Sequence, residues 1–273
     1  MRDLLRTTVY RLMKFTAFRK IAAIPIAVGN LFRKELINYQ RDSKAALDMH
    51  VWQELLNSQL EVRQGPFLGM AYPGFVSFNS ARLPKLFGTY ESEIYPDLER
   101  LLQQSPEVVI DIGAADGYYA VGIAKRLPRT PVRCFDLNPE ALAFCKQMAE
   151  KNQVQNLSIE TLFHPEYFTD LSGKQALLIV DIDGGEKPLF TAKAVASLNK
   201  SSLIIETHDY LDPTITSGLI ELFSPSHSIK VINFKTDKSE EAPEAISSLS
   251  AQDIATVMRE RIVDNKWLIL EPK

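Results

Sequence analysis

Residues 108–121 read VVIDIGAADGYYAV, and this stretch decides the fold. A short apolar run ends at Asp111, the chain passes through Gly113 and Gly117, and a segment of small and aromatic residues follows at once. This pattern predicts a strand, a turn and the first turn of a helix. Because Gly113 has no Cβ, the chain can turn sharply there and bring its backbone close to a ligand.

The charges around this turn indicate the kind of ligand. Gly117 leaves the N-terminus of the helix bare, where free N–H groups and the positive end of the helix dipole favour a carboxylate or a phosphate. Asp111 and Asp116 lie in the same stretch, and their negative charges argue against a phosphate. We therefore expect a ligand that carries an ammonium group next to a carboxylate.

The next predicted strand, PVRCFDL at residues 131–137, ends on Asp136. An acid at the tip of the second strand of a βαβ unit usually binds ribose hydroxyls. Asn138, Pro139 and Glu140 follow as an N-cap, a first-turn proline and a first-turn acid, and they predict a helix through about residue 152. We therefore expect Asp136 at a strand end that faces the ligand.

These motifs resemble the S-adenosylmethionine site of class I methyltransferases. DIGAADG and FDLNPEAL carry the resemblance, and GTYESEIYPDLERLL at residues 88–102 is similar to the approach to the site in the FkbM-type subgroup. DIDGGE at 181–186 and LIIETHD at 203–209 resemble the last two strand ends on the catalytic face of that subgroup. The resemblance covers roughly residues 83–210.

The resemblance implies an α/β fold: a Rossmann-like, seven-stranded, mostly parallel sheet with helices on both faces, plus an N-terminal helical extension. It implies S-adenosyl-L-methionine as the cofactor and a small-molecule or glycan acceptor, methylated on a hydroxyl of a sugar, a polysaccharide or a natural product. The cofactor-binding residues that it implies are Asp111, Gly113, Ala114 and Gly117 at the first turn, Asp136 and Leu137 after the second strand, Phe163 beside the adenine, and Asp181.

Polar residues follow the fourth and fifth predicted strands. Asp181 and Glu206 end these strands, and Asp183 and His208 lie two residues further on. If the chain stays extended, each pair points to the same side. One interpretation is that Asp181 and Glu206 bound the cofactor pocket while Asp183, His208 and Asp209 only cap loops and helices.

Two other interpretations of these residues stay open. His208 suits a general base that takes the proton of a substrate hydroxyl, because the pKa of a free histidine is about 6.5. Alternatively, Asp181, Asp183, Glu206 and Asp209 are hard oxygen ligands for magnesium or calcium. We assign catalytic roles to His208, Asp183 and Glu206, assign no metal ligand, and keep a divalent metal as an alternative.

The composition of the chain is that of an ordinary globular protein. Of its 273 residues, 45% are hydrophobic and 24% are charged, so we expect a sizeable core. The net charge of −3 gives no overall basic field, and we expect no nucleic-acid partner. Cys134 and Cys145 lack the spacing of a zinc site, so we expect buried free thiols in a reducing cytoplasm.

Strands alternate with helical patterns from residue 106 onward, which predicts a parallel sheet. The predicted strands are 108–111, 132–136, 157–162, 176–181, 203–206, 228–234 and 266–270. Residues 81–273 are expected to form the methyltransferase domain, and 1–80 a helical extension with a cap at 65–88. Asp42 or Ser43 is expected to start a helix, the polar run 236–244 to form a solvated loop, and Ser250 to cap a helix through about residue 262.

The first forty residues carry a basic arm. Eight lysines and arginines face two acids there, a net charge of +6. The apolar run at 21–32 is far shorter than the roughly 20 residues of a membrane span, and it lacks the features of a signal peptide. We expect a cytoplasmic protein, with peripheral contact through residues 1–40 at the inner membrane surface as one possibility and a helix packed on its own domain as the other.

Two rival functions remain. A nicotinamide-dependent oxidoreductase also needs a βαβ unit with an acid after the second strand, but its G-x-G-x-x-G fingerprint is broken here by Ala115. A non-catalytic protein that binds a membrane surface or a partner on a methyltransferase scaffold would use the basic arm instead of the site.

Overall fold

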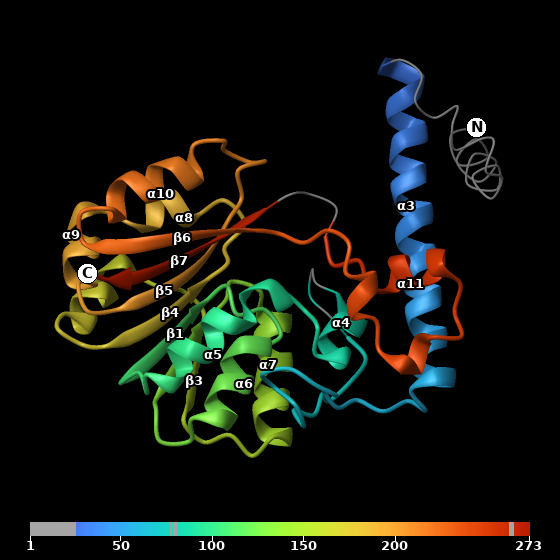
Figure 1. Ribbon diagram of the computed structural model, residues 1–273, viewed down its shortest axis with the longest axis horizontal. Coiled ribbons are helices and arrows are strands. Elements are labelled where there is room, and N and C mark those ends of the chain that lie inside the picture. The colour runs from blue at the N-terminus through green and yellow to red at the C-terminus, as the bar shows by residue number, and fades with distance from the viewer. Residues whose placement is uncertain (1–25, 77, 79–80, 262–264) are drawn as a thin grey trace. The chain divides into compact units, whose positions relative to one another are not determined.

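The computed structural model describes residues 26–76, 78, 81–261 and 265–273, and for residues 26–35 it describes the backbone alone. Within these residues, seven strands form one sheet in the order β3-β2-β1-β4-β5-β7-β6 (Figure 1). The strands are β1 Val108–Ile112, β2 Val132–Phe135, β3 Leu157–Glu160, β4 Ala176–Val180, β5 Ser202–Thr207, β6 His227–Asn233 and β7 Lys266–Pro272. All seven predicted strands are confirmed, with shifts of one or two residues at their ends.

The sheet is parallel except at one edge. Strands β1 to β5 pair in parallel, and β7 inserts antiparallel between β5 and β6. The chain order reverses at β1, which lies between β2 and β4. In doubly wound sheets, ligands bind beyond the carboxyl ends of the strands at this switch point. The turn that follows β1 therefore lies where a ligand is expected.

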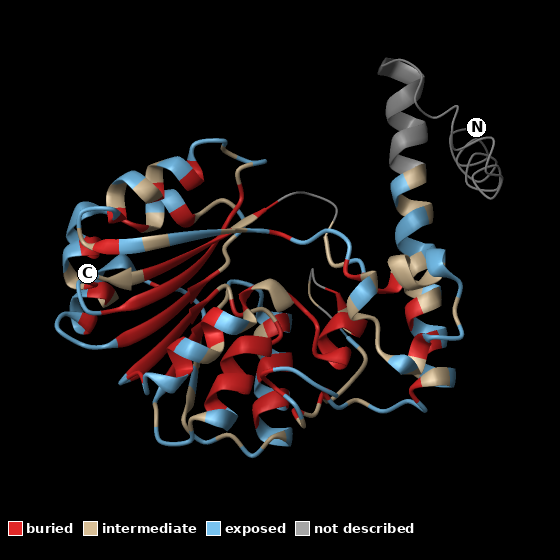
Figure 2. Cartoon of the chain, in the orientation of Figure 1, coloured by how far each residue is buried: buried red, intermediate tan, exposed pale blue. Residues whose placement is uncertain are grey.

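Helices cover both faces of the sheet, as predicted. Figure 1 shows α5 (Tyr95–Gln103), α6 (Tyr118–Arg126) and α7 (Pro139–Lys151) along one face, and α8 (Glu186–Leu189), α9 (Ala192–Ser197) and α10 (Ile215–Phe223) along the other. Strands β1, β4 and β5 are buried along their whole length (Figure 2), because a strand covered on both faces has no solvent side. This burial explains why most residues of these strands are apolar.

The start of α7 follows its sequence signal closely. The side-chain oxygen of Asn138 accepts hydrogen bonds from the backbone N–H groups of Glu140 at 3.0 Å and Ala141 at 3.4 Å. Pro139 occupies the first helical position, where its missing N–H costs nothing. The predicted cap is therefore confirmed, and it fixes where the chain leaves β2.

The chain divides into two compact units. One consists of residues up to Gln59 together with Glu244–Val257, and the other of Leu60–Pro243 together with Met258–Lys273. The sheet, its helices and α4 (Arg82–Phe87) belong to the second unit. The predicted division into 1–80 and 81–273, which separates a cap from a catalytic domain, stays a prediction.

In the first unit, the predicted helix start at Asp42 or Ser43 is wrong. Helix α3 runs without a break over Ile26–His50 and continues into a π-helical turn at Val51–Leu55. Short polar side chains that can cap a helix are also tolerated on an exposed face within one, so the capping signal was ambiguous. Ser250 does start α11, Ala251–Val257, by accepting the N–H of Asp253 at 3.1 Å, although the helix ends five residues earlier than predicted.

Most of the predicted basic arm, residues 1–25, lies outside the described residues. Its contact with a membrane therefore stays a prediction. None of the described helices has both the length and the apolar character that crossing a membrane requires.

Candidate active site

The turn after β1 packs directly against the end of β4. Gly113 has φ +90°, and a Cβ at this position would lie 1.6 Å from the backbone oxygen of Asp181. The close approach that the sequence predicted at Gly113 is therefore made by the neighbouring strand of the protein itself. A Cβ on Gly117 would lie 2.6 Å from the sulfur of Cys145, so this glycine allows α6 to pack against α7.

A cavity of about 190 Å³ opens beside this turn, and it lies within the second unit alone. Its walls include six of the residues predicted from the sequence: Asp111, Gly113, Ala114, Asp136, Asp181 and Asp183. The walls also include residues that were not predicted from the sequence, among them Phe78, Lys85, Tyr90, Glu91 and Arg261. The predicted segment 65–88 thus contributes Phe78 and Lys85 to the walls.

Three predicted cofactor residues lie outside these walls, as far as the described residues define them. Gly117 serves helix packing, Leu137 is exposed, and Phe163 is buried among the rings of Phe135 and Phe168 in the core. Their roles in cofactor binding stay predictions. An aromatic residue after a strand is as suited to the core as to a ligand, and Phe163 contributes to the core.

Asp136 joins the first two strand ends. One of its carboxylate oxygens accepts the backbone N–H of Ala115 at 2.8 Å, and the other accepts that of Asn138 at 2.7 Å. The carboxylate lies in the cavity wall, at the predicted strand end. Each oxygen keeps a second lone pair, so these two bonds leave Asp136 able to accept a hydroxyl of a ligand.

Asp111 is buried with an unsatisfied oxygen. Burial, reinforced by the charge of Asp181, raises the pKa of Asp111 to about 8. Its Oδ2 atom has no hydrogen-bond partner among the described residues. A buried acceptor without a donor is costly, and an ammonium group from a ligand would satisfy it. Asp111 therefore fits an ammonium group of a ligand.

Asp116 is paired within the protein, and its role toward a positively charged ligand stays a prediction. Lys85 on α4 places its Nζ 2.7 Å and 2.9 Å from the two carboxylate oxygens of Asp116, and both side chains are buried. The ammonium also lies 5.0 Å from the ring centre of Tyr90 and 5.5 Å from that of Tyr118. The sequence offered one signal for this pair, a single lysine inside the apolar segment RLPKLF.

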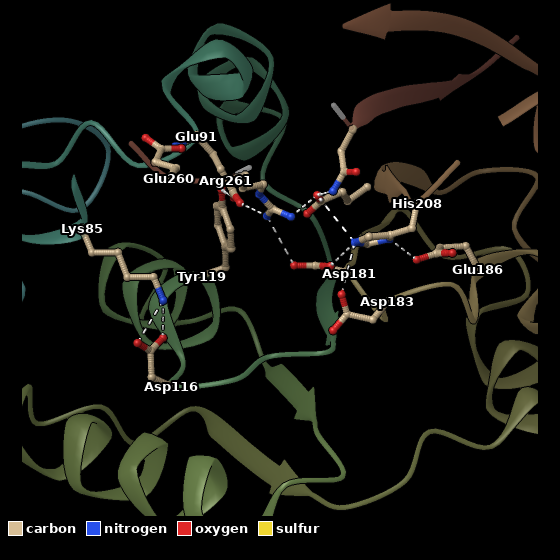
Figure 3. Close-up of polar contacts among 12 residues, drawn as sticks. Lys85, Glu91, Asp116, Tyr119, Asp181, Asp183, Glu186, His208, Glu260 and Arg261 are labelled. Carbon is tan, nitrogen blue, oxygen red and sulfur yellow. Dashed lines mark hydrogen bonds and ion pairs between the residues drawn. The ribbon is translucent and has the colours of Figure 1, made fainter. Parts of the chain in front are cut away.

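Four polar residues at the ends of β4 and β5 converge, as predicted, and Figure 3 shows three of them, Asp181, Asp183 and His208. Nε2 of His208 lies 3.5 Å from Asp181, 3.5 Å from Asp183 and 3.6 Å from Glu206, measured to a carboxylate oxygen in each case. Its Nδ1 atom lies 2.6 Å from Glu186, the last residue of the DIDGGE motif. Their catalytic roles stay predictions. Asp209 lies apart from them, because its carboxylate binds Lys266 and the N–H of Thr216.

The pKa values in this cluster reflect burial and crowded negative charge. Burial raises the pKa of Asp181 to about 6 and, together with the charge of Asp181, raises the pKa of Glu206 well above its usual value. Burial alone would lower the pKa of His208, but the hydrogen bond to Glu186 and the charges of Asp181, Glu186 and Asp183 outweigh it and raise that pKa. The cluster therefore attracts cations.

Arg261 supplies one cation to this cluster. Its guanidinium group bonds to the carboxylates of Glu91 and Glu206, and it lies 3.8 Å from Asp181 (Figure 3). Tyr119 donates its hydroxyl to Glu91 at 2.5 Å. Neither Glu91 nor Arg261 was predicted from the sequence as a site residue. Glu91 lies within the quoted motif at 88–102, whereas Arg261 is 55 residues from Glu206 and gives no local signal.

The chain is similar to several known proteins. A model of the methyltransferase small domain family matches residues 97–181. Solved structures similar to this chain include precorrin-6y C5,15-methyltransferase from Geobacter metallireducens GS-15, with 15% identity over 66% of this chain and 89% of that chain and a TM-score of 0.44. An rRNA methylase from Streptococcus thermophilus has 14% identity over 66% of this chain and 96% of that chain, with a TM-score of 0.45.

The bifunctional kinase-methyltransferase WbdD is also similar, with 19% identity over 70% of this chain and 39% of that chain and a TM-score of 0.42. No curated protein matches the chain. The segment matched by the family model begins within α5 and ends at Asp181, just after β4, so it contains the turn after β1 and Asp136.

Proposed function

We propose that the chain transfers the methyl group of S-adenosylmethionine to a hydroxyl of a sugar, a polysaccharide or a natural product, as an FkbM-type enzyme. One observation carries this proposal: the carboxylates of Asp181 and Asp183 line the same cavity as the unsatisfied carboxylate of Asp111. Asp111, which would bind the amino acid end of the cofactor, therefore lines the same cavity as the carboxylates that could accept a proton.

The cofactor side of the site relies on two acids. Asp111 would accept the ammonium of the methionine end, and Asp136 would accept a ribose hydroxyl while it holds the N–H of Ala115. S-adenosylmethionine supplies an already activated methyl group, so the protein mainly has to hold the acceptor in line with the carbon–sulfur bond.

The acceptor side favours an oxygen nucleophile, because a hydroxyl has to lose a proton as it is methylated. The side chain of Asp183 is 74% exposed, whereas that of His208 is buried directly behind it. We assign the transfer to Asp183: its carboxylate takes the hydroxyl proton as the new O–C bond forms and the C–S bond breaks. His208 then positions the carboxylates from behind.

The test is a methyl-transfer assay with isotopically labelled S-adenosylmethionine and a panel of monosaccharides, polysaccharides and phenolic natural products. We expect an O-methylated product from one of these classes. Asp183→Asn should lower kcat by about tenfold or more, while the dissociation constant for S-adenosylmethionine stays unchanged. Asp170→Asn, at an exposed aspartate outside the cavity, is the matched control. Methylation of nitrogen alone, or full activity of Asp183→Asn, would contradict the proposal.

A nicotinamide-dependent oxidoreductase is disfavoured by one contact. The backbone N–H of Ala115, which stands where the dinucleotide fingerprint needs its second glycine, already donates to Asp136. A pyrophosphate bound at this turn would have to replace the hydrogen bond between Ala115 and Asp136. It would also lie beside the negative charge of the Asp136 carboxylate. Titration calorimetry with NAD and with S-adenosylmethionine separates the two functions, and binding of NAD alone would overturn the proposed methyl transfer.

A further inference from the structure

The imidazole of His208 is held in one orientation by Glu186. The two atoms concerned, Nδ1 and Oε1, lie 2.6 Å apart, and both side chains are buried. An ionised carboxylate only accepts hydrogen bonds, so Nδ1 carries the proton. A carboxylate behind a histidine in this way fixes its tautomer and its direction, which is the usual support of a metal-binding imidazole.

The opposite nitrogen of this ring faces three carboxylates. Asp181, Asp183 and Glu206 each place an oxygen 3.5–3.6 Å from Nε2, and among the described residues this atom has no hydrogen-bond partner. Oε2 of Glu206 is also buried without a partner within the described part of the chain. The oxygens of three carboxylates therefore surround Nε2, and a positive charge among them would offset their mutual repulsion.

Arg261 neutralises part of this negative charge. Its guanidinium group bonds to Glu91 and to Oε1 of Glu206, the oxygen that lies 3.6 Å from Nε2. Asn265 donates to the same Oε1 atom at 2.5 Å. Oε2 of Glu206 and Nε2 of His208 have no hydrogen-bond partner among the described residues, so these two atoms are open to another cation.

We propose that His208, Asp181 and Glu206 bind one divalent first-row transition ion of the Mn²⁺ class. Their ligand atoms lie within 4.8 Å of one another. Bonds of about 2.1 Å place opposite ligands of an ion about 4.2 Å apart, so small side-chain rotations suffice to close the site. Carboxylates suit magnesium, calcium and manganese, whereas imidazole suits transition metals, and this mixed set favours manganese over magnesium.

The position of the site gives the ion a chemical role, which rests on the proposed function. Asp183 is the exposed member of the cluster, so the open coordination positions would face it and the cavity. An ion there would hold the acceptor hydroxyl and lower its pKa, next to the carboxylate that takes the proton.

The test is a titration with Mn²⁺ of the full chain from which metal has been removed by a chelator. Binding is measured as the loss of the electron paramagnetic resonance signal of free Mn²⁺. We expect about one bound ion per chain, and binding weaker by about tenfold or more in His208→Gln and in Asp181→Asn. His164→Gln, at a half-exposed histidine outside the cluster, is the matched control and should bind like the unaltered chain. Circular dichroism shows whether each variant is folded. Asp181 is partly exposed, so we expect Asp181→Asn to fold and to test the site even if His208→Gln unfolds.

Three outcomes would overturn the inference: no loss of signal at millimolar Mn²⁺, unchanged binding in the folded variants, or displacement of Mn²⁺ by an equal concentration of Mg²⁺, which would exclude an imidazole ligand. Calorimetry with S-adenosylmethionine on the same sample separates the two proposals. Cofactor binding without Mn²⁺ binding refutes the metal site alone. Mn²⁺ binding without cofactor binding refutes the proposed function alone.

Discussion

The ammonium group of Lys85 lies 2.7 Å from the carboxylate of Asp116, and both side chains are buried. Breaking a buried ion pair by removing one partner leaves an uncompensated charge, which costs about 3–5 kcal/mol. We therefore expect Lys85→Met to lower the free energy of unfolding by that amount, measured by urea denaturation. The double variant Lys85→Met with Asp116→Asn should recover much of the loss, because no charge is then left buried.

Lys146→Met is the control for this pair, because Lys146 is an exposed lysine on α7. Its free energy of unfolding should stay within about 0.5 kcal/mol of that of the unaltered chain. If the single and double variants at Lys85 and Asp116 lose equal stability, the cost comes from packing and the ion pair has no special weight.

Binding of S-adenosylmethionine should depend on pH through Asp111. Its pKa is about 8 in the free protein, and an ammonium group beside the carboxylate would lower that pKa. The cofactor therefore prefers ionised Asp111, and binding releases a proton. Between about pH 6 and pH 7.5, where most Asp111 is still protonated, the dissociation constant should fall by up to about tenfold per pH unit as the pH rises.

Calorimetry in a metal-free buffer measures this dependence. Asp111→Asn should bind the cofactor more weakly and without this pH slope, whereas Asp170→Asn should keep the slope. A slope that persists in Asp111→Asn would assign the titration to another group and would remove Asp111 from the site.

The sequence predicted those parts of the structure that depend on neighbouring residues. Asn138, Pro139 and Glu140 specify a helix start by contacts within a few residues, and the structure has that start. The apolar runs that become β1, β4 and β5 were recognisable because both of their faces are buried. The convergence of Asp181 and His208 followed from the parallel order of their strands.

The missed contacts join residues that are far apart in the chain. Arg261 is 170 residues from Glu91, and periodicity carries no information over that distance. The polar run 236–244, predicted to be a solvated loop, is partly buried, because Lys238 is held by Glu93 at 2.6 Å and Glu260 at 3.0 Å. A lysine in a polar run reads as exposed until its partners are known. Buried ion pairs of this kind can be located only from the structure.

Gly113 should tolerate no side chain. A Cβ there would lie 1.6 Å from a backbone oxygen of Asp181, and a backbone atom at the end of a buried strand cannot move aside cheaply. We expect Gly113→Ala to be folded poorly and to lose cofactor binding. Gly173→Ala is a matched control, because Gly173 also has a positive φ, +79°, but a Cβ added there would have no atom of the described residues within 4 Å. Its cost should be the backbone strain alone, about 1–3 kcal/mol by thermal or urea denaturation.

The net charge of +6 in residues 1–40 predicts binding to anionic membranes that weakens with salt. Each lysine or arginine near such a surface contributes about 1 kcal/mol, so replacing the arginines and lysines among residues 1–20 by glutamine should abolish most of it. Sedimentation with vesicles of phosphatidylcholine alone, and with added phosphatidylserine, measures the effect on the full chain and on this variant. Equal sedimentation of both chains with anionic vesicles would dismiss membrane attachment through the arm, and methyl transfer in the variant would show whether the arm matters for catalysis.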